Sequence, residues 1–288
     1  MPSLIDIRRR IRSVRNTQQI TKAMKMVSAA KLRRAQDRVI AARPYAALIR
    51  EVMANLVAHA RIFDEEHMPP LLARRPENRI LLMLLTGDKG LCGAFNTNLI
   101  KASQSFLAEH SAARVELELI GRKGRDYYRR RQTPVSGEYV NVFAKVEYSV
   151  AREIAQKAIQ RFTFQEIDAV YLLYNEFKSV LSQKLVVDRI LPLHPPEGRE
   201  APVDPIYEEP PEAILRYLLP KYVEVQVYHA MIESAAAEHA ARMTAMDSAT
   251  SNAADMIDSL TLYLNRVRQA SITKEIIEVV SGAAAAAQ

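Results

Sequence analysis

The end of the chain contains almost nothing that interrupts a helix. From Tyr222 to Gln288 there is no proline, and the only glycine is Gly282. Proline removes a helical hydrogen bond and glycine weakens a helix, so this stretch predicts one continuous helix of about 60 residues. At 1.5 Å per residue such a helix is about 95 Å long, roughly three times the width of a small domain. A single globular core cannot cover it, so it needs a second long helix as a partner.

Three zones of this predicted helix differ in side-chain size. Between Glu233 and Ile257 alanine and serine predominate, which allows another backbone to approach closely. The next apolar residues recur at three- and four-residue steps, the spacing of a coiled-coil contact: Ile257, Leu260, Leu264 and Val267. The last turns spread apolar side chains around the helix, which predicts a surrounding partner surface. These residues are Ile272, Ile276, Ile277, Val279 and Val280.

The beginning of the chain predicts the partner helix. From Ser3 to about His59 there is no glycine, and Pro44 is the only interruption; we expect it to bend the helix without ending it. One heptad register runs through this stretch with a polar middle. Its positions are Leu4, Ile7, Ile11, Val14, Gln18, Thr21, Lys25, Ser28, Leu32, Ala35, Val39, Ala42, Ala46, Ile49, Met53 and Leu56. Ile20, Met24 and Val27 form a second apolar stripe, so contact from two sides is expected.

The two helices lie at opposite ends of the chain, so their natural pairing is antiparallel. Between Met1 and Arg38 eleven basic residues face two acidic ones, whereas Val227 to Gln288 holds seven acidic and four basic residues. The two segments therefore attract, although exposed ion pairs contribute only tenths of a kcal/mol each. The apolar register must provide most of the stability.

The middle of the chain alternates between short apolar runs and helical segments. We expect strands at 79–85, 115–120, 169–174 and 183–191, with a turn near 176–179, and helices at 97–109, 124–131 and 147–161. This alternation predicts a Rossmann-like α/β domain over residues 78–192. The whole chain is then an α-dominated α+β protein: an antiparallel coiled coil of residues 1–60 and 212–288, the inserted domain, and a proline-rich connector at 193–211. Pro220 is expected to break or kink the second helix near its start.

The composition excludes several classes of protein. The longest purely apolar run in the interior, Ile80 to Leu85, is far shorter than the roughly 20 residues that span a bilayer. Cys92 is the only cysteine, so no internal disulfide can form. None of the six histidines has the spacing of a metal site or a catalytic triad. We therefore expect no membrane span, no metal and no cofactor.

Two features are candidates for function. The turn TGDKGLCGAFN, Thr86 to Asn96, follows a strand and opens a helix, a place where phosphate can bind, but its glycine spacing matches neither the dinucleotide fingerprint nor a P-loop. A structural turn is the stronger interpretation. The second candidate is the basic band between Arg8 and Arg34, which contains no aromatic residue. Its charge leaves nucleic acid, anionic lipid, an acidic protein and a solvated helix face open.

Three segments resemble one known family. IRRRIRSVRNTQQITKAMKMVSAAKLRRAQ at 7–36, the turn TGDKGLCGAFN, and the C-terminal run EHAARMTAMDSATSNAADMI followed by LTLYLNRVRQASITKEIIEVVSGA are similar to the gamma subunit of F-type ATP synthases. They occur in the family's order and span essentially the whole chain. The resemblance implies a rotating central stalk, a non-catalytic subunit of a proton-translocating ATP synthase complex. The stalk would transmit torque and couple ion translocation to ATP synthesis or hydrolysis. A basic coiled-coil protein that binds nucleic acid is the alternative.

The resemblance also implies partners and contact residues. The partners would be the hexameric ring of alpha and beta subunits, the epsilon subunit and the c-subunit ring, with one copy of this chain per complex and no nucleic acid. Contacts with beta subunits would involve Lys22, Met24, Lys25, Arg242, Gln269 and Thr273. Ile276, Ile277, Val279 and Val280 would form a bearing tip. Tyr207 and Glu208 would meet the c ring and epsilon.

The location and one departure follow from the same resemblance. The chain would lie peripherally on the cytoplasmic side of the bacterial plasma (inner) membrane. Some relatives carry an arginine where this chain has Pro220, so a joint at that end of the stalk is expected. With Cys92 alone the chain lacks the paired cysteines of chloroplast relatives, which favours a bacterial origin.

Overall fold

The structure, a computed structural model, describes residues 3–60, 69–193 and 211–286. The chain divides into two compact units. The smaller unit consists of Met1–Ser28 with Met243–Gln288, and the larger consists of Ala29–Arg242. Two long helices, α1 (Leu4–Ala60) and α5 (Pro211–Ala286), contribute to both units. No helix in the described ranges is long and apolar enough to cross a membrane.

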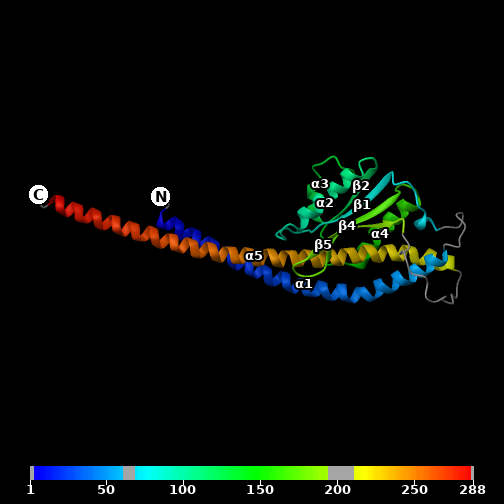
Figure 1. The fold of residues 1–288 in the computed structure, drawn as a ribbon, viewed down its shortest axis with the longest axis horizontal. Coiled ribbons are helices and arrows are strands. Elements are labelled where there is room, and N and C mark those ends of the chain that lie inside the picture. Colours follow the sequence, from blue (N-terminus) through cyan, green and yellow to red (C-terminus); the bar gives the residue numbers. More distant parts are fainter. Residues whose placement is uncertain (1–2, 61–68, 194–210, 287–288) are drawn as a thin grey trace. The chain divides into compact units, whose positions relative to one another are not determined.

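The larger unit contains a five-stranded sheet in the order β3-β2-β1-β4-β5 (Figure 1). The strands are β1 (Arg79–Leu85), β2 (Arg114–Ile120), β3 (Val135–Tyr139), β4 (Ala169–Phe177) and β5 (Gln183–Leu191). The first four are parallel, and β5 pairs antiparallel with β4 through a short turn. Parallel sheets are packed against other elements on both faces, so the sequence of a central strand such as β1 is apolar throughout. All of its residues after Arg79 are buried.

Helices cover both faces of this sheet. α2 (Phe95–Glu109) and α3 (Arg122–Tyr128) lie on one face, and α4 (Tyr148–Thr163) lies on the other together with the first part of α5 (Figure 1). A short 3-10 helix, η2 (Pro70–Leu72), precedes β1. This arrangement confirms the predicted Rossmann-like fold. The four expected strands and three expected helices are all present, with ends that differ by up to three residues.

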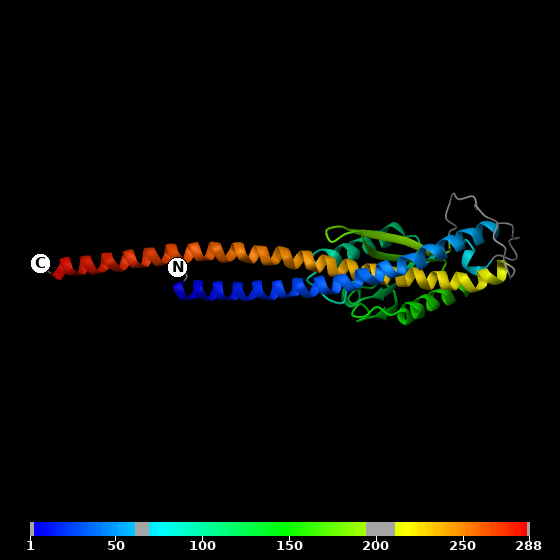
Figure 2. The ribbon, with the colours of Figure 1, turned by 90° about the horizontal axis from the view of Figure 1, so that it is seen from below.

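In the larger unit α1 lies beside α5 in both views (Figure 2). The predicted register is buried at Leu32, Val39, Ile49, Met53 and Leu56. Arg43 lies 3.7 Å from Glu233 of α5, and the charge of Arg50 acts on His229. Since a higher number on α1 meets a lower number on α5, the two helices are antiparallel here.

The smaller unit repeats this pairing. The side chain of Lys25 forms an ion pair of 2.6 Å with Asp247, and the hydroxyl of Thr250 donates a 2.8 Å hydrogen bond to that of Thr21. Thr21 is buried, as is Ile7. Two positions in the polar middle of the predicted register, Thr21 and Lys25, therefore bond to α5 inside an antiparallel helix pair. Ile20 and Val27, in the second predicted stripe, are exposed.

The expected break at Pro220 is wrong. α5 begins at Pro211 and continues through Pro220. Proline lacks one backbone N–H, but its fixed φ is helical. On the turns around it, Leu215, Leu219 and Val223 are fully buried, and this packing offsets the lost hydrogen bond. Pro44 likewise lies inside α1 without ending it, as expected.

Candidate functional site

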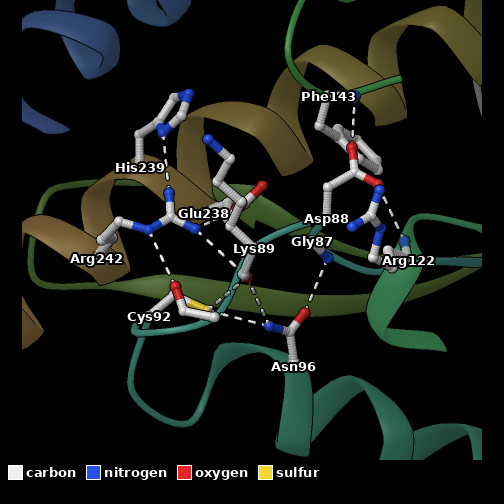
Figure 3. Close-up of polar contacts among 11 residues, drawn as sticks. Gly87, Asp88, Lys89, Cys92, Asn96, Arg122, Phe143, Glu238, His239 and Arg242 are labelled. Carbon is white, nitrogen blue, oxygen red and sulfur yellow. Dashed lines mark hydrogen bonds and ion pairs between the residues drawn. The ribbon is translucent and has the colours of Figure 1, made fainter. Parts of the chain in front are cut away.

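The turn between β1 and α2 is held by hydrogen bonds to side chains of the same segment (Figure 3). The backbone N–H of Gly87 donates to the side-chain oxygen of Asn96 at 2.8 Å, and the Asn96 amide donates to the sulfur of Cys92 at 3.1 Å. Leu91 and Gly93 have φ values of 61° and 56°, so the chain reverses twice through the left-handed region. A turn of this kind is fixed by internal bonds and does not need a ligand to order it.

Asp88, in the same turn, binds three backbone N–H groups of other segments. Its carboxylate accepts hydrogen bonds from the backbone N–H groups of Arg122 at 3.0 Å, Asn141 at 2.8 Å and Phe143 at 3.2 Å. The N–H of Arg122 is the first of α3, so the aspartate caps that helix. The anion that these donors bind is therefore part of the chain, which favours the structural interpretation of the turn.

Helix α5 binds to this turn through a buried ion pair. The guanidinium of Arg242 pairs with Glu238 one helical turn earlier. Its Nε also donates to the carbonyl of Gly90 at 3.2 Å, and Nη2 donates to that of Lys89 at 3.4 Å. A Cβ on Gly87 would lie 2.9 Å from the Glu238 carboxyl carbon, so glycine is what permits this close approach.

Burial sets the protonation of the groups in this cluster. It raises the pKa of Glu238, and Arg242 offsets part of the rise. It lowers the pKa of His239 to about 4, assisted by the positive charges of Arg242, Lys31 and Lys89. It also raises the pKa of the Cys92 thiol. A thiol that stays protonated at neutral pH is a poor nucleophile.

Two further carboxylates attach α5 to other elements of the larger unit. Glu224 accepts a 2.5 Å hydrogen bond from the hydroxyl of Tyr148 and one of 3.2 Å from Gln156, both on α4. Glu233 accepts the backbone N–H of Phe177, at the end of β4, at 3.0 Å. We call Glu224, Glu233 and Glu238 the α5 carboxylates; all three are buried. Glu224 connects α5 to α4 and Glu233 connects it to β4, whereas Glu238 pairs with Arg242, which bonds to the turn after β1.

The residues around these glutamates contain a signal of their burial. Around Glu233 and Glu238 alanine occupies almost every side of the helix, which indicates contact on more than one face. Acidic residues on such a helix must therefore be buried and paired. The described residues contain no group of three or more histidine, cysteine, aspartate or glutamate side chains that would hold a metal ion.

Comparison with known proteins identifies the family. A family model described as ATP synthase matches residues 3–286. The ATP synthase gamma chain of Solibacter usitatus is 68% identical over 286 residues, covering 99% of this chain and 100% of the relative. That of an Anaeromyxobacter species is 52% identical over 289 residues and covers 99% of both. This chain belongs to the ATP synthase gamma chain family.

Solved structures agree with this assignment. A chain of the central stalk and c ring of Tetrahymena thermophila mitochondrial ATP synthase aligns with a TM-score of 0.61 and 25% identity, covering 80% of this chain and 99% of that chain. A chain of Euglena gracilis mitochondrial ATP synthase, 19% identical, has the same fold with a TM-score of 0.66, covering 98% and 94%. The chain is accordingly a non-catalytic stalk subunit, and the nucleic-acid-binding alternative is not supported.

The contact residues implied by the family occupy different environments. In the smaller unit Lys22 is exposed, Met24 is half-buried and Lys25 is paired with Asp247. Gln269 and Thr273 are exposed, and the Thr273 hydroxyl donates to the Gln269 carbonyl at 2.9 Å. Arg242 belongs to the larger unit and is buried in the cluster described above. Five of the six residues therefore belong to the smaller unit and one to the larger.

The last predicted contacts lie at the end of α5 and in the connector. The four apolar residues of the predicted bearing tip are each 57–71% exposed: Ile276, Ile277, Val279 and Val280. Tyr207 and Glu208 lie outside the described residues, as does most of the connector.

Proposed function

We propose that this chain is the rotating shaft of an ATP synthase and transmits torque between a membrane c ring and a catalytic ring of alpha and beta subunits. The observation that carries the proposal is the attachment of α5 at three points. Glu224 bonds to α4, Glu233 bonds to β4, and Arg242, which is paired with Glu238, bonds to the turn after β1. A force applied to the α/β domain reaches the helix through three separate points. Slippage of α5 would leave buried carboxylates unpaired, at a cost of several kcal/mol each.

In this proposal each part of the chain has its own role. Residues 1–60 and 212–288 form the shaft, residues 78–192 form the foot that meets the c ring and epsilon, and 193–211 connect them. Tyr207 and Glu208 belong to the foot contact. The complex contains one copy of the chain, translocates protons and lies at the cytoplasmic side of the bacterial inner membrane. Support comes from the family and from a stalk relative that was solved together with a c ring.

Contacts with the beta subunits distribute over both ends of the shaft. Lys22, Met24 and Lys25 face an acidic segment of beta, and Gln269 and Thr273 contact beta loops in turn. Arg242 acts indirectly, by keeping α5 fixed to the turn. The apolar tip, Ile276 to Val280, runs as a bearing, because apolar contact has little directional preference. Each contact biases the conformation of one catalytic site by differential binding.

Purification of the chain at its native level tests the function. Alpha, beta, epsilon and c subunits are expected to co-purify with it in a stable complex. Their absence from a preparation that retains the folded chain would contradict the proposal.

Substitution of Met24 tests the coupling contact. A lysine between Lys22 and Lys25 adds a third cation that strengthens the contact with the acidic beta segment. We expect Met24→Lys to reduce ATP-driven proton pumping relative to ATP hydrolysis in the assembled complex. Met26→Lys is the matched control, since Met26 is 64% exposed two residues further along. Equal pumping-to-hydrolysis ratios in Met24→Lys and wild type would refute the contact.

A further inference from the structure

A cavity in the larger unit lies where α1, the loop before α4 and α5 meet. Its volume is about 140 Å³. Phe143, Val146 and Ile232 give it apolar walls, and three cations of α1 line it: Lys31, Arg34 and Arg38. We call this cavity, with its three cations, the basic pocket. A dry cavity on the order of 150 Å³ holds a molecule of benzene, so this one suits an apolar side chain of leucine or phenylalanine size.

The three cations of the basic pocket have no acidic partner among the residues that the structure describes. All three are exposed. The acidic residue whose charge interacts with Lys31 is Glu238, and it is already paired with Arg242. Arg43, on the same helix, by contrast lies 3.7 Å from Glu233. A concentration of cations without anions attracts a negatively charged partner and depends on salt.

An apolar stripe continues from the basic pocket along α1. Tyr45, Leu48 and Val52 are 53%, 60% and 36% exposed. Their spacing of three and four residues places them on one face of the helix. Arg38 and Arg34 lie on that face about two and three turns before Tyr45. The surface therefore has an apolar end and a basic end. A bound helix with one apolar face and carboxylates at one end would complement both.

We propose that this surface docks an acidic amphipathic helix of a partner protein, which inserts one apolar side chain into the basic pocket. The inserted side chain is surrounded by a rim of cations that meet the helix's carboxylates, the usual arrangement of a central apolar contact inside a polar rim. A protein helix fits better than a lipid surface because the pocket is concave and has the size of one side chain. The inference rests on the proposed function, since the partner is sought in the ATP synthase complex.

A photo-crosslinker in the purified complex tests the proposal. Ala144 lines the basic pocket and is exposed, so benzoylphenylalanine can replace it. Leu181, 84% exposed on the β4–β5 turn, is the control position. We expect position 144 to crosslink to one segment of another subunit that is amphipathic and carries carboxylates. The double change Arg34→Glu with Arg38→Glu is expected to lower the yield at least tenfold, whereas Arg130→Glu, at an exposed arginine elsewhere, leaves it unchanged.

Each other outcome overturns the inference. A yield no higher than at position 181, or a crosslinked segment without carboxylates, would exclude the proposed helix. Binding of the purified chain to phosphatidylserine vesicles that is lost in the Arg34→Glu, Arg38→Glu variant would make the surface a lipid site instead. If alpha, beta and epsilon co-purify and the crosslink fails, this inference alone is wrong. If they do not co-purify, the proposed function fails first.

Discussion

The buried pair of Glu238 and Arg242 allows a quantitative test of how α5 is attached. Their side chains are only 5% and 9% exposed, whereas those of Lys25 and Asp247 are 38% and 60% exposed. Arg242→Met keeps an unbranched apolar stem but removes the guanidinium, so it leaves a buried carboxylate unpaired, at a cost of about 3–5 kcal/mol. Lys25→Met removes an exposed ion pair and should cost about 1 kcal/mol or less. Both variants replace the cation of an ion pair with an uncharged methionine, one at a buried pair and the other at an exposed pair.

The native thiol of Cys92 reports how often the Glu238–Arg242 cluster opens, so no reporter residue has to be introduced. It is the only cysteine, it is 2% exposed, and it lies in the turn that Arg242 contacts. Its rate of reaction with a thiol reagent under native conditions therefore measures how often the turn opens. At a tenfold change per 1.4 kcal/mol, the cost of about 3–5 kcal/mol predicts that Arg242→Met accelerates the reaction about 10²- to 4 × 10³-fold. Lys25→Met should change it less than about tenfold.

A double-mutant cycle with Glu238→Gln isolates the pair. If the ion pair carries the effect, the cost of Arg242→Met becomes much smaller when Glu238 has already been replaced. Equal acceleration by Arg242→Met in both backgrounds, or equal acceleration by Arg242→Met and Lys25→Met, would refute the reasoning.

Two further predictions concern the same unit. Burial raises the pKa of Glu238 and the charge of Arg242 lowers it, so Arg242→Met raises this pKa further. The stabilisation that comes from the protonated carboxyl in the folded chain is then fully present below the unfolded pKa near 4.5. It is lost as the pH rises through the folded pKa. Urea unfolding followed by circular dichroism should show a larger cost of Arg242→Met at pH 8 than at pH 5, and the same cost at both would contradict this. Gly121 has a φ of 108°, and a Cβ there would lie 1.9 Å from the Thr86 carbonyl oxygen, so Gly121→Ala should cost about 3 kcal/mol or more. The control Gly282→Ala has no atom within 4 Å and should stabilise its helix by about 0.5–1 kcal/mol; similar urea midpoints for the two variants would exclude the strain.

Periodicity was sufficient to predict the helices and the buried strands. The heptad register of α1 needs only the sequence, because burial at positions such as Leu32, Val39 and Ile49 repeats with the helical period. β1 was equally clear, since a strand covered on both faces is apolar throughout. In both cases one local pattern contains the whole signal.

The missed features depend on contacts between distant segments. β3 has the sequence VSGEY, which lacks an apolar run, and it forms a strand because β2 supplies its hydrogen bonds. The net charge of α5 predicts that its acidic residues balance the basic charge of α1. In the structure, Glu238 instead pairs with Arg242 and packs against Gly87 of the turn after β1. Glu233 also accepts a hydrogen bond from the backbone of Phe177 at the end of β4. Net charge shows that a segment is acidic, but not which neighbour each carboxylate meets.

The antiparallel pairing of α1 and α5 also determines when the chain can fold during synthesis. Lys25 and Asp247 are separated by 222 residues, so a ribosome that adds 5–20 residues per second completes the second roughly 10–45 s after the first. The apolar register of α1 has no helix to pack on during that interval, although the sheet strands are already made. Newly synthesised α1 therefore exposes its apolar register until α5 is made. Truncation before Asp247 should leave a chain that aggregates.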